Sequence, residues 1–215
     1  MFDQWQNILL ISSHTDDAEL AMGGTINRLV NAGYNLFHLI LSDAKEQAKL
    51  RGYKPNILRN ECKKANEVLG LKPMMLHVYG DYPVNHFNKH RQSIADMLYK
   101  YKMAFKPDVV FVNSSFDTHQ DHQVTFHEAV RIFKDIGILG YEFPYNNLSF
   151  DYDMIVGLTE TNMEIKLDAC SEYVSQQDRA YFSRDAIRAV AKVNALRTGG
   201  IYPYAEAFEV VRLIW

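Results

Sequence analysis

Two short clusters of histidines and aspartates contain the side chains best suited to chemistry. His14, Asp16 and Asp17 lie in the segment ISSHTDDAEL (11–20). The second cluster is the segment DTHQDH, which contributes Asp117, His119, Asp121 and His122. Two imidazoles and one carboxylate, with a fourth position open to water, form a catalytic zinc arrangement. If the clusters meet, we expect a metal site that activates water, with a spare carboxylate as general base.

Helix capping is the competing interpretation of the first cluster. Asp16 and Asp17 stand where a helix is expected to begin, and aspartate is favoured there as a cap and by the helix dipole. Taken alone, the first cluster fits capping as well as chemistry. Capping does not account for a second His/Asp cluster at another strand end, so the pair favours a metal or catalytic site.

Each cluster follows a short apolar run that reads as a buried strand. Such runs alternate with segments of helical periodicity over the first two thirds of the chain. The predicted strands are 7–12, 34–42, 74–79 and 108–113, and the predicted helices are 17–32, 56–70, 88–105 and 122–137. This alternation predicts an α/β fold with a mainly parallel, Rossmann-like sheet flanked by helices. Sites in such sheets lie at the carboxyl ends of the strands, where both clusters are found.

The rhythm changes after Ile138. Two strand-like runs (138–144 and 153–159) follow each other without a helix between them, and then come two helices and a last strand. These later elements are predicted at 162–173, 185–197 and 207–214. No linker rich in Pro, Gly or Ser separates them from the rest. We therefore expect a C-terminal extension on the same core and one domain over residues 1–215.

Composition excludes several classes of protein. Apolar residues make up 47% of the 215 residues, which supports a large core, and the net charge of −3 gives no reason to expect nucleic acid as a partner. No apolar run reaches the roughly 20 residues of a membrane span, and no signal peptide is visible. With only Cys62 and Cys170, a cytoplasmic location without disulfides is expected. The oligomeric state stays open, and a homo-oligomer is compatible with the sequence.

The two clusters resemble the signatures of a known family. HTDDAELAMGGTI (14–26) and DTHQDH (117–122) are similar to the first and second signatures of the PIG-L/LmbE-like family of zinc-dependent N-deacetylases. Weaker similarities follow in the family's order, in RNECKKANEVLG, YVSQQ and YAEAF. The resemblance runs from the first strand to the last and implies a single LmbE-like deacetylase domain.

The resemblance implies a role for each residue of the clusters. It makes His14, Asp17 and His122 the metal ligands and Asp16 the general base. The implied metal is Zn²⁺, although two histidines and an aspartate also accept Fe²⁺ or Co²⁺.

It further makes His119 the group that stabilises the tetrahedral intermediate, charged and oriented by Asp121, and Arg59 the group that holds substrate hydroxyl or phosphate oxygens. The implied reaction removes an acetyl group from an N-acetylated amino sugar or its conjugate, by zinc-activated water. Two alternatives remain open from the residues: hydrolysis of another amide, ester or phosphoester bond, and a non-catalytic module with a structural metal.

The sequence departs from the family pattern at two places. Thr15 replaces the usual proline of the first signature, and the segment SDAKEQAKLRGY (42–53) lacks a Gly-Glu pair found in many members. Substrate specificity is expected to reside in the loops 43–55, 80–90 and 140–150. Within them, we consider Asp81 and Tyr82 for substrate contacts, and Tyr141, Phe143 or Tyr145 for stacking on a sugar face.

Overall fold

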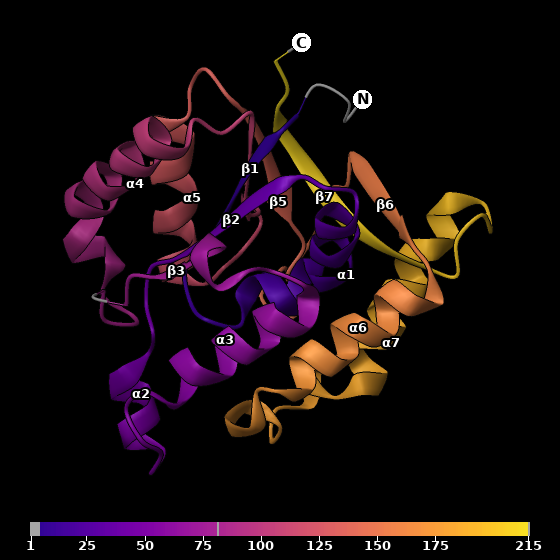
Figure 1. Cartoon of the computed structure of the whole chain (residues 1–215), viewed down its shortest axis with the longest axis horizontal. Coiled ribbons are helices and arrows are strands. Elements are labelled where there is room, and N and C mark those ends of the chain that lie inside the picture. Colours follow the sequence, from indigo (N-terminus) through magenta and orange to yellow (C-terminus); the bar gives the residue numbers. More distant parts are fainter. Residues whose placement is uncertain (1–4, 81, 215) are drawn as a thin grey trace.

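A twisted sheet runs through the centre of the molecule (Figure 1). The structure, a computed structural model, describes residues 5–80 and 82–214. Among these, seven strands lie in the order β3-β2-β1-β4-β5-β7-β6. The strands are β1 (Asn7–Ser12), β2 (Asn35–Ile40), β3 (Leu76–Val78), β4 (Val109–Asn113), β5 (Gly137–Tyr141), β6 (Met154–Leu158) and β7 (Tyr204–Arg212). The first five are parallel, in the doubly wound order 3-2-1-4-5, which confirms the predicted Rossmann-like fold.

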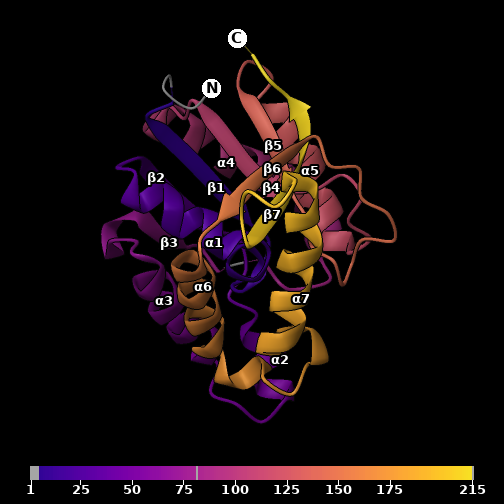
Figure 2. The same ribbon diagram turned by 90° about the vertical axis from the view of Figure 1, so that its right-hand side faces the viewer.

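Helices cover both faces of this sheet. Their bounds are α1 (Asp17–Asn31), α2 (Lys45–Leu50), α3 (Ile57–Leu69), α4 (Arg91–Phe105), α5 (Gln120–Ile132), α6 (Glu160–Ser171) and α7 (Arg184–Ala195). Helices α4 and α5 lie on one face, and α1, α3, α6 and α7 lie on the other (Figures 1 and 2). No helix of the described residues is long and apolar enough to span a membrane.

Strand β1 shows why both faces must be covered. Successive residues of a strand point to opposite sides. Ile8 and Leu10 accordingly join the core beneath α1 and α3, whereas Leu9 and Ile11 join the core beneath α4 and α5, and all four are fully buried. A continuous apolar run is therefore needed, which is the pattern that indicated a parallel strand.

The C-terminal extension completes the same sheet, as expected. Strand β7 lies antiparallel between β5 and β6, while α6 packs on α1 and α3 and α7 packs on β7. The C-terminal extension thus packs against α1, the first helix of the chain.

Two predictions about elements were wrong. The helix expected over 122–137 ends at Ile132, because Phe133 turns the chain into the core and Gly137 already begins β5. The segment 45–50, expected as a loop, is the short helix α2. Six residues with only Ala48 buried give too little periodicity to recognise a helix.

Helix α1 is kinked at Met22, and a buried ion pair satisfies the backbone groups that the kink frees. Met22 has φ −134° and ψ 26°, outside the helical range. The Glu206 carboxylate accepts hydrogen bonds from the N–H groups of Gly24 (3.0 Å) and Thr25 (2.7 Å). The Lys166 ammonium donates to the carbonyl of Ala21 at 3.1 Å and to Glu206 at 2.7 Å. The extension is therefore tied to the helix that follows the first cluster.

Gly24 is needed at this crossing. A Cβ atom there would lie 2.4 Å from Cδ1 of Leu158 on β6. Gly24 thus allows helix and sheet to approach closely.

We expect Glu206→Ala to destabilise the protein by about 3–5 kcal/mol, because it leaves the Lys166 charge and two helix N–H groups buried without a partner. Urea unfolding followed by circular dichroism measures this loss. Glu46→Ala, which removes an exposed pair with Lys49, is the control and should change little. A loss for Glu206→Ala no larger than the control's would contradict this account.

A buried chain of polar side chains joins β1, β2, α3 and α1. His38 on β2 is held between the Ser12 hydroxyl (2.9 Å from Nε2) and the Asn66 side-chain carbonyl (2.9 Å from Nδ1). Asn66 in turn donates to the Glu19 carboxyl group. Burial lowers the pKa of His38 to about 4, so the ring is neutral in the folded protein at pH 7.

This pKa makes folding stability depend on pH. Because the folded pKa lies below the unfolded value of 6.5, the unfolded chain binds more protons between about pH 4 and 6.5. Stability from this group is therefore present above pH 6.5 and is lost as the pH falls towards 4, by about 3 kcal/mol. The unfolding free energy of His38→Gln, measured across this range, should fall less steeply than that of the unaltered protein. Equal slopes would refute the assignment.

Candidate active site

The two His/Asp clusters meet above the carboxyl ends of β1 and β4. These strands are parallel neighbours, with Ile8 opposite Val109, so the turns that follow them are adjacent. The strand order reverses between them, as β2 lies on the far side of β1 and β5 on the far side of β4. Such a switch point is the usual ligand site of a doubly wound sheet.

Two imidazoles and one carboxylate converge at this point. Nδ1 of His14 lies 3.1 Å from Nε2 of His122. Asp17, in the first turn of α1, places Oδ2 3.3 Å from Nε2 of His122 and Oδ1 3.7 Å from Nδ1 of His14. Asp17 also accepts a hydrogen bond of 2.8 Å from the backbone N–H of His14, which closes the turn between them. All three are buried.

A carboxylate behind each imidazole fixes the orientation of its ring. Oδ2 of Asp121 lies 3.1 Å from Nε2 of His14, and Oδ2 of Asp117 lies 2.6 Å from Nδ1 of His122. Asp121 is itself held by the N–H groups of Asn85 and Phe87. Such carboxylate–histidine pairs are typical of metal-ligating histidines, whose other nitrogen faces the ion.

The electrostatics of the cluster favour a cation. Burial alone would lower the pKa of each imidazole. Asp17 and Asp121 outweigh burial and raise the pKa of His14 to about 9, and Asp17 and Asp117 raise that of His122 to about 10. Against the effect of burial, the two imidazoles lower the pKa of Asp17. A divalent metal ion bound here would replace the protons that the carboxylates attract, so the donor set fits the implied metal.

Two overlapping ligand sets are available. Nitrogen atoms of His14, His119 and His122 lie within 4.8 Å of one another. The expected set of His14, Asp17 and His122 is also close together, by the distances given above. We favour the set with Asp17, because its carboxylate touches both imidazoles and carries the charge that a divalent cation requires.

His119 begins helix α5 and faces the cluster as a neutral imidazole. Its Nδ1 accepts a hydrogen bond from the backbone N–H of Asp121 at 3.1 Å, which caps the helix and leaves Nε2 as the N–H donor. Burial and the charges on His14 and His122 lower the pKa of His119 to about 4. This differs from the expected charged histidine, and the carboxylate of Asp121, expected to orient His119, contacts His14 instead.

The two adjacent aspartates have different surroundings in the structure. Asp16 occupies the N-cap position of α1, but its side chain makes no capping hydrogen bond, so the capping interpretation fails for it. Its carboxylate lines the cavity in front of His14 and His122. Burial and the neighbouring negative charge of Asp17 raise the pKa of Asp16, which favours uptake of a proton.

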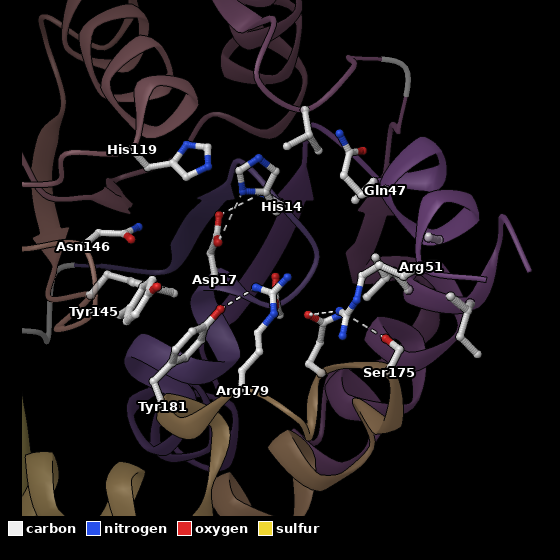
Figure 3. Close-up of a pocket in the computed structure, with 18 of the residues that line it drawn as sticks. His14, Asp17, Gln47, Arg51, His119, Tyr145, Asn146, Ser175, Arg179 and Tyr181 are labelled. Atoms are coloured by element: carbon white, nitrogen blue, oxygen red, sulfur yellow. Dashed lines mark hydrogen bonds and ion pairs between the residues drawn. The ribbon is translucent and has the colours of Figure 1, made fainter. Parts of the chain in front are cut away.

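The cluster opens into a cavity of about 180 Å³ (Figure 3). Its walls come from the predicted specificity loops: Gln47, Arg51 and Tyr53 from 43–55, Val84 from 80–90, and Phe143, Tyr145 and Asn146 from 140–150. A further wall, the segment 175–181, was not predicted from the sequence. The weak family similarity in YVSQQ (173–177) overlaps this segment and was the one signal that could have indicated it. The segment contributes Ser175, Gln176, Arg179 and Tyr181.

Several residues predicted to contact substrate lie elsewhere. Arg59 is outside the cavity lining and pairs with Asp43 at 3.1 Å. Tyr141 is fully buried, and its hydroxyl donates to the carbonyl of Ile11. Tyr82 is buried away from this cavity, and Asp81 lies outside the described residues.

Fold and site together define a doubly wound α/β protein with a carboxylate-backed His/Asp centre, and comparison with known proteins gives its family. Residues 9–133 match the model of the PIG-L family, described as GlcNAc-PI de-N-acetylase. This covers more than half of the chain, so the protein belongs to that family.

Individual relatives are distant but span most of the chain. Diacetylchitobiose deacetylase of Thermococcus kodakarensis is 26% identical over 201 residues, which cover 92% of this chain and 70% of the relative. The structure of N,N'-diacetylchitobiose deacetylase from Pyrococcus horikoshii has a TM-score of 0.79 and 21% identity, and the match covers 98% of this chain and 85% of that one.

The same fold also occurs in an enzyme of another class. The structure of 4-carboxy-2-hydroxymuconate hydratase from Pseudomonas putida KT2440 has a TM-score of 0.73 at 19% identity, and the match covers 98% of both chains. Likeness of fold therefore does not decide the reaction, which depends on the residues of the site.

The two ligand sets make different predictions about metal content. We expect Asp17→Ala to lose bound metal and His119→Ala to retain it, because His119 donates a hydrogen bond in our assignment. Metal stoichiometry after loading with Zn²⁺ and desalting, measured by plasma emission spectroscopy, checks this. Circular dichroism of both variants controls for folding. Retention by Asp17→Ala together with loss by His119→Ala would instead establish the three-histidine set.

Proposed function

We propose that the chain is a single-domain, metal-dependent N-deacetylase that removes the acetyl group from an N-acetylated amino sugar or its conjugate. One observation carries the proposal above all. His14, Asp17 and His122 lie together, and each imidazole is hydrogen-bonded to a further carboxylate. The Asp16 side chain, which caps no helix, lines the same cavity. Membership in the GlcNAc-PI de-N-acetylase family supports the same reaction.

His14, Asp17 and His122 would hold the metal, and Asp117 and Asp121 would orient the two imidazoles. Zn²⁺ suits this set, as do Fe²⁺ and Co²⁺. When bound, such an ion polarises a carbonyl and lowers the pKa of water towards 7.

Asp16 carries out the proton transfers, and His119 stabilises the oxyanion. Asp16, with its raised pKa, takes the proton of the attacking water as general base. The Nε2–H group of neutral His119 donates a hydrogen bond to the oxyanion of the tetrahedral intermediate. Asp16 then returns its proton to the departing amine. A purely structural metal site would leave the Asp16 side chain, which makes no capping hydrogen bond, without a role.

The cavity walls suit a sugar. Asn146 and Gln47 offer amide groups for hydroxyl contacts, and the rings of Tyr145 and Tyr181 stack at 4.3 Å in the same cavity wall. The relatives named above are deacetylases of diacetylchitobiose, which is the basis for naming an amino sugar as substrate. A cytoplasmic location is part of the proposal, and the free, buried thiols of Cys62 and Cys170 are consistent with it.

We expect Asp16→Asn to keep its metal and to lower kcat for acetate release by about 10²–10⁴. The physical reason is that the amide cannot accept the proton of the attacking water. Acetate release from N-acetylglucosamine and diacetylchitobiose, with metal content measured in parallel, provides the test. Asp185→Asn, which removes an exposed aspartate outside the cavity, should match the unaltered enzyme. The proposal fails if Asp16→Asn releases acetate at the normal rate.

A further inference from the structure

The wall missed by sequence reasoning is held rigidly. Glu61 on α3 is buried, and its carboxylate accepts hydrogen bonds from the N–H (2.9 Å) and the hydroxyl (2.6 Å) of Ser175. The side-chain amide of Gln177 donates to the carbonyls of Cys170 and Tyr173 at the end of α6. The segment therefore presents its side chains to the cavity in a set arrangement before any ligand binds.

Two arginines of this cavity differ in how their charges are balanced. Arg51 donates to both carboxylate oxygens of Asp178, at 2.7 and 2.8 Å, and its charge is neutralised. No carboxylate oxygen of the described residues lies within 4.0 Å of the Arg179 guanidinium; Asp16 and Asp178 act on it only at longer range. Arg179 thus brings to the cavity wall a positive charge that has no direct ion-pair partner among the described residues.

The neighbours of Arg179 fix where this charge lies. Arg179 donates to the hydroxyl of Tyr181, whose ring stacks on Tyr145. In Figure 3 the Arg179 guanidinium points from the wall towards the cluster, beside the Tyr181 hydroxyl. A sugar ring placed on the tyrosine pair would carry its substituents within reach of this guanidinium.

The geometry points to a substrate in which the amino sugar bears an anionic group, a phosphate or a carboxylate, that Arg179 binds. A guanidinium is well suited to such groups because its parallel N–H donors match two oxygens of a phosphate or carboxylate. Arg179 is then a specificity-determining residue. The inference deepens the proposed function, on which the sugar part of the substrate rests.

The test compares neutral and anionic sugars on the Zn²⁺-loaded protein. We expect kcat/KM for N-acetylglucosamine 1-phosphate to exceed that for N-acetylglucosamine by at least about tenfold. In Arg179→Gln this ratio should fall to about one, because kcat/KM for the phosphorylated sugar falls more than kcat/KM for the neutral sugar. Arg179→Lys should restore part of the preference. N-acetylmuramic acid provides the carboxylate arm, so the preferred anion is read from the same assay.

Arg51→Gln is the matched variant, since it removes an arginine of the same cavity whose charge Asp178 already balances. We expect it to keep the preference for the phosphorylated sugar. Equal kcat/KM for neutral and anionic sugars in the unaltered enzyme would overturn the inference. So would an equal loss on both sugars in Arg179→Gln, which would make Arg179 a counter-ion of Asp16 instead.

Calorimetry separates this inference from the proposed function. If no sugar releases acetate, yet N-acetylglucosamine 1-phosphate binds and Arg179→Gln weakens its binding about tenfold, the anion site stands and the deacetylase proposal fails. If acetate is released without preference for an anion, the reverse holds. If neither acetate release nor Arg179-dependent binding is seen, both are wrong.

Discussion

The structure depends on two carboxylate–imidazole pairs at the carboxyl ends of neighbouring strands. Asp121 holds His14 across more than a hundred residues of chain, and Asp117 holds His122 within its own turn. Buried carboxylates are costly unless they are paired, and here their partners are the same imidazoles that face each other at 3.1 Å. A cation bound by the imidazoles would balance the negative charge of these buried carboxylates. The adjacency of β1 and β4 therefore serves this centre directly, and the remaining strands and helices hold these two in place.

The C-terminal extension supports the same centre from behind. Lys166 and Glu206 satisfy the broken helix α1 just after its first turn, which carries Asp17. The segment that follows α6 then lies beside the His/Asp cluster and forms one wall of the cavity. A part of the chain outside the match to the family model thus both braces helix α1 and lines the cavity.

The His/Asp cluster and the outer wall of the cavity differ in charge. Around the imidazoles, aspartates supply negative charge that a metal ion would offset, whereas the outer wall carries the positive charge of Arg179, which has no direct ion-pair partner among the described residues. A related fold serves a hydratase, so the scaffold by itself specifies neither bond nor substrate. The proposed reaction therefore rests on the groups around the cavity: Asp16 as a carboxylate that caps no helix, His119 as a neutral imidazole, and Arg179 beside a tyrosine pair.

The sequence by itself determined the strand–helix alternation, the parallel sheet and the two turns that carry the His/Asp clusters, because buried strands and helix starts leave local patterns in the residues. Through its resemblance to the family signature, it also predicted different roles for Asp16 and Asp17.

The tertiary structure decided the rest. Short helix α2 and the wall at 175–181 have no strong periodicity, and their position depends on contacts such as Ser175 with Glu61. Arg59 and Arg179 look alike in the sequence; only the fold shows that Asp43 occupies the first, while the second faces the cavity without a carboxylate beside it. Whether two charged side chains pair depends on the distance between them in the folded protein, and the sequence alone does not contain that distance.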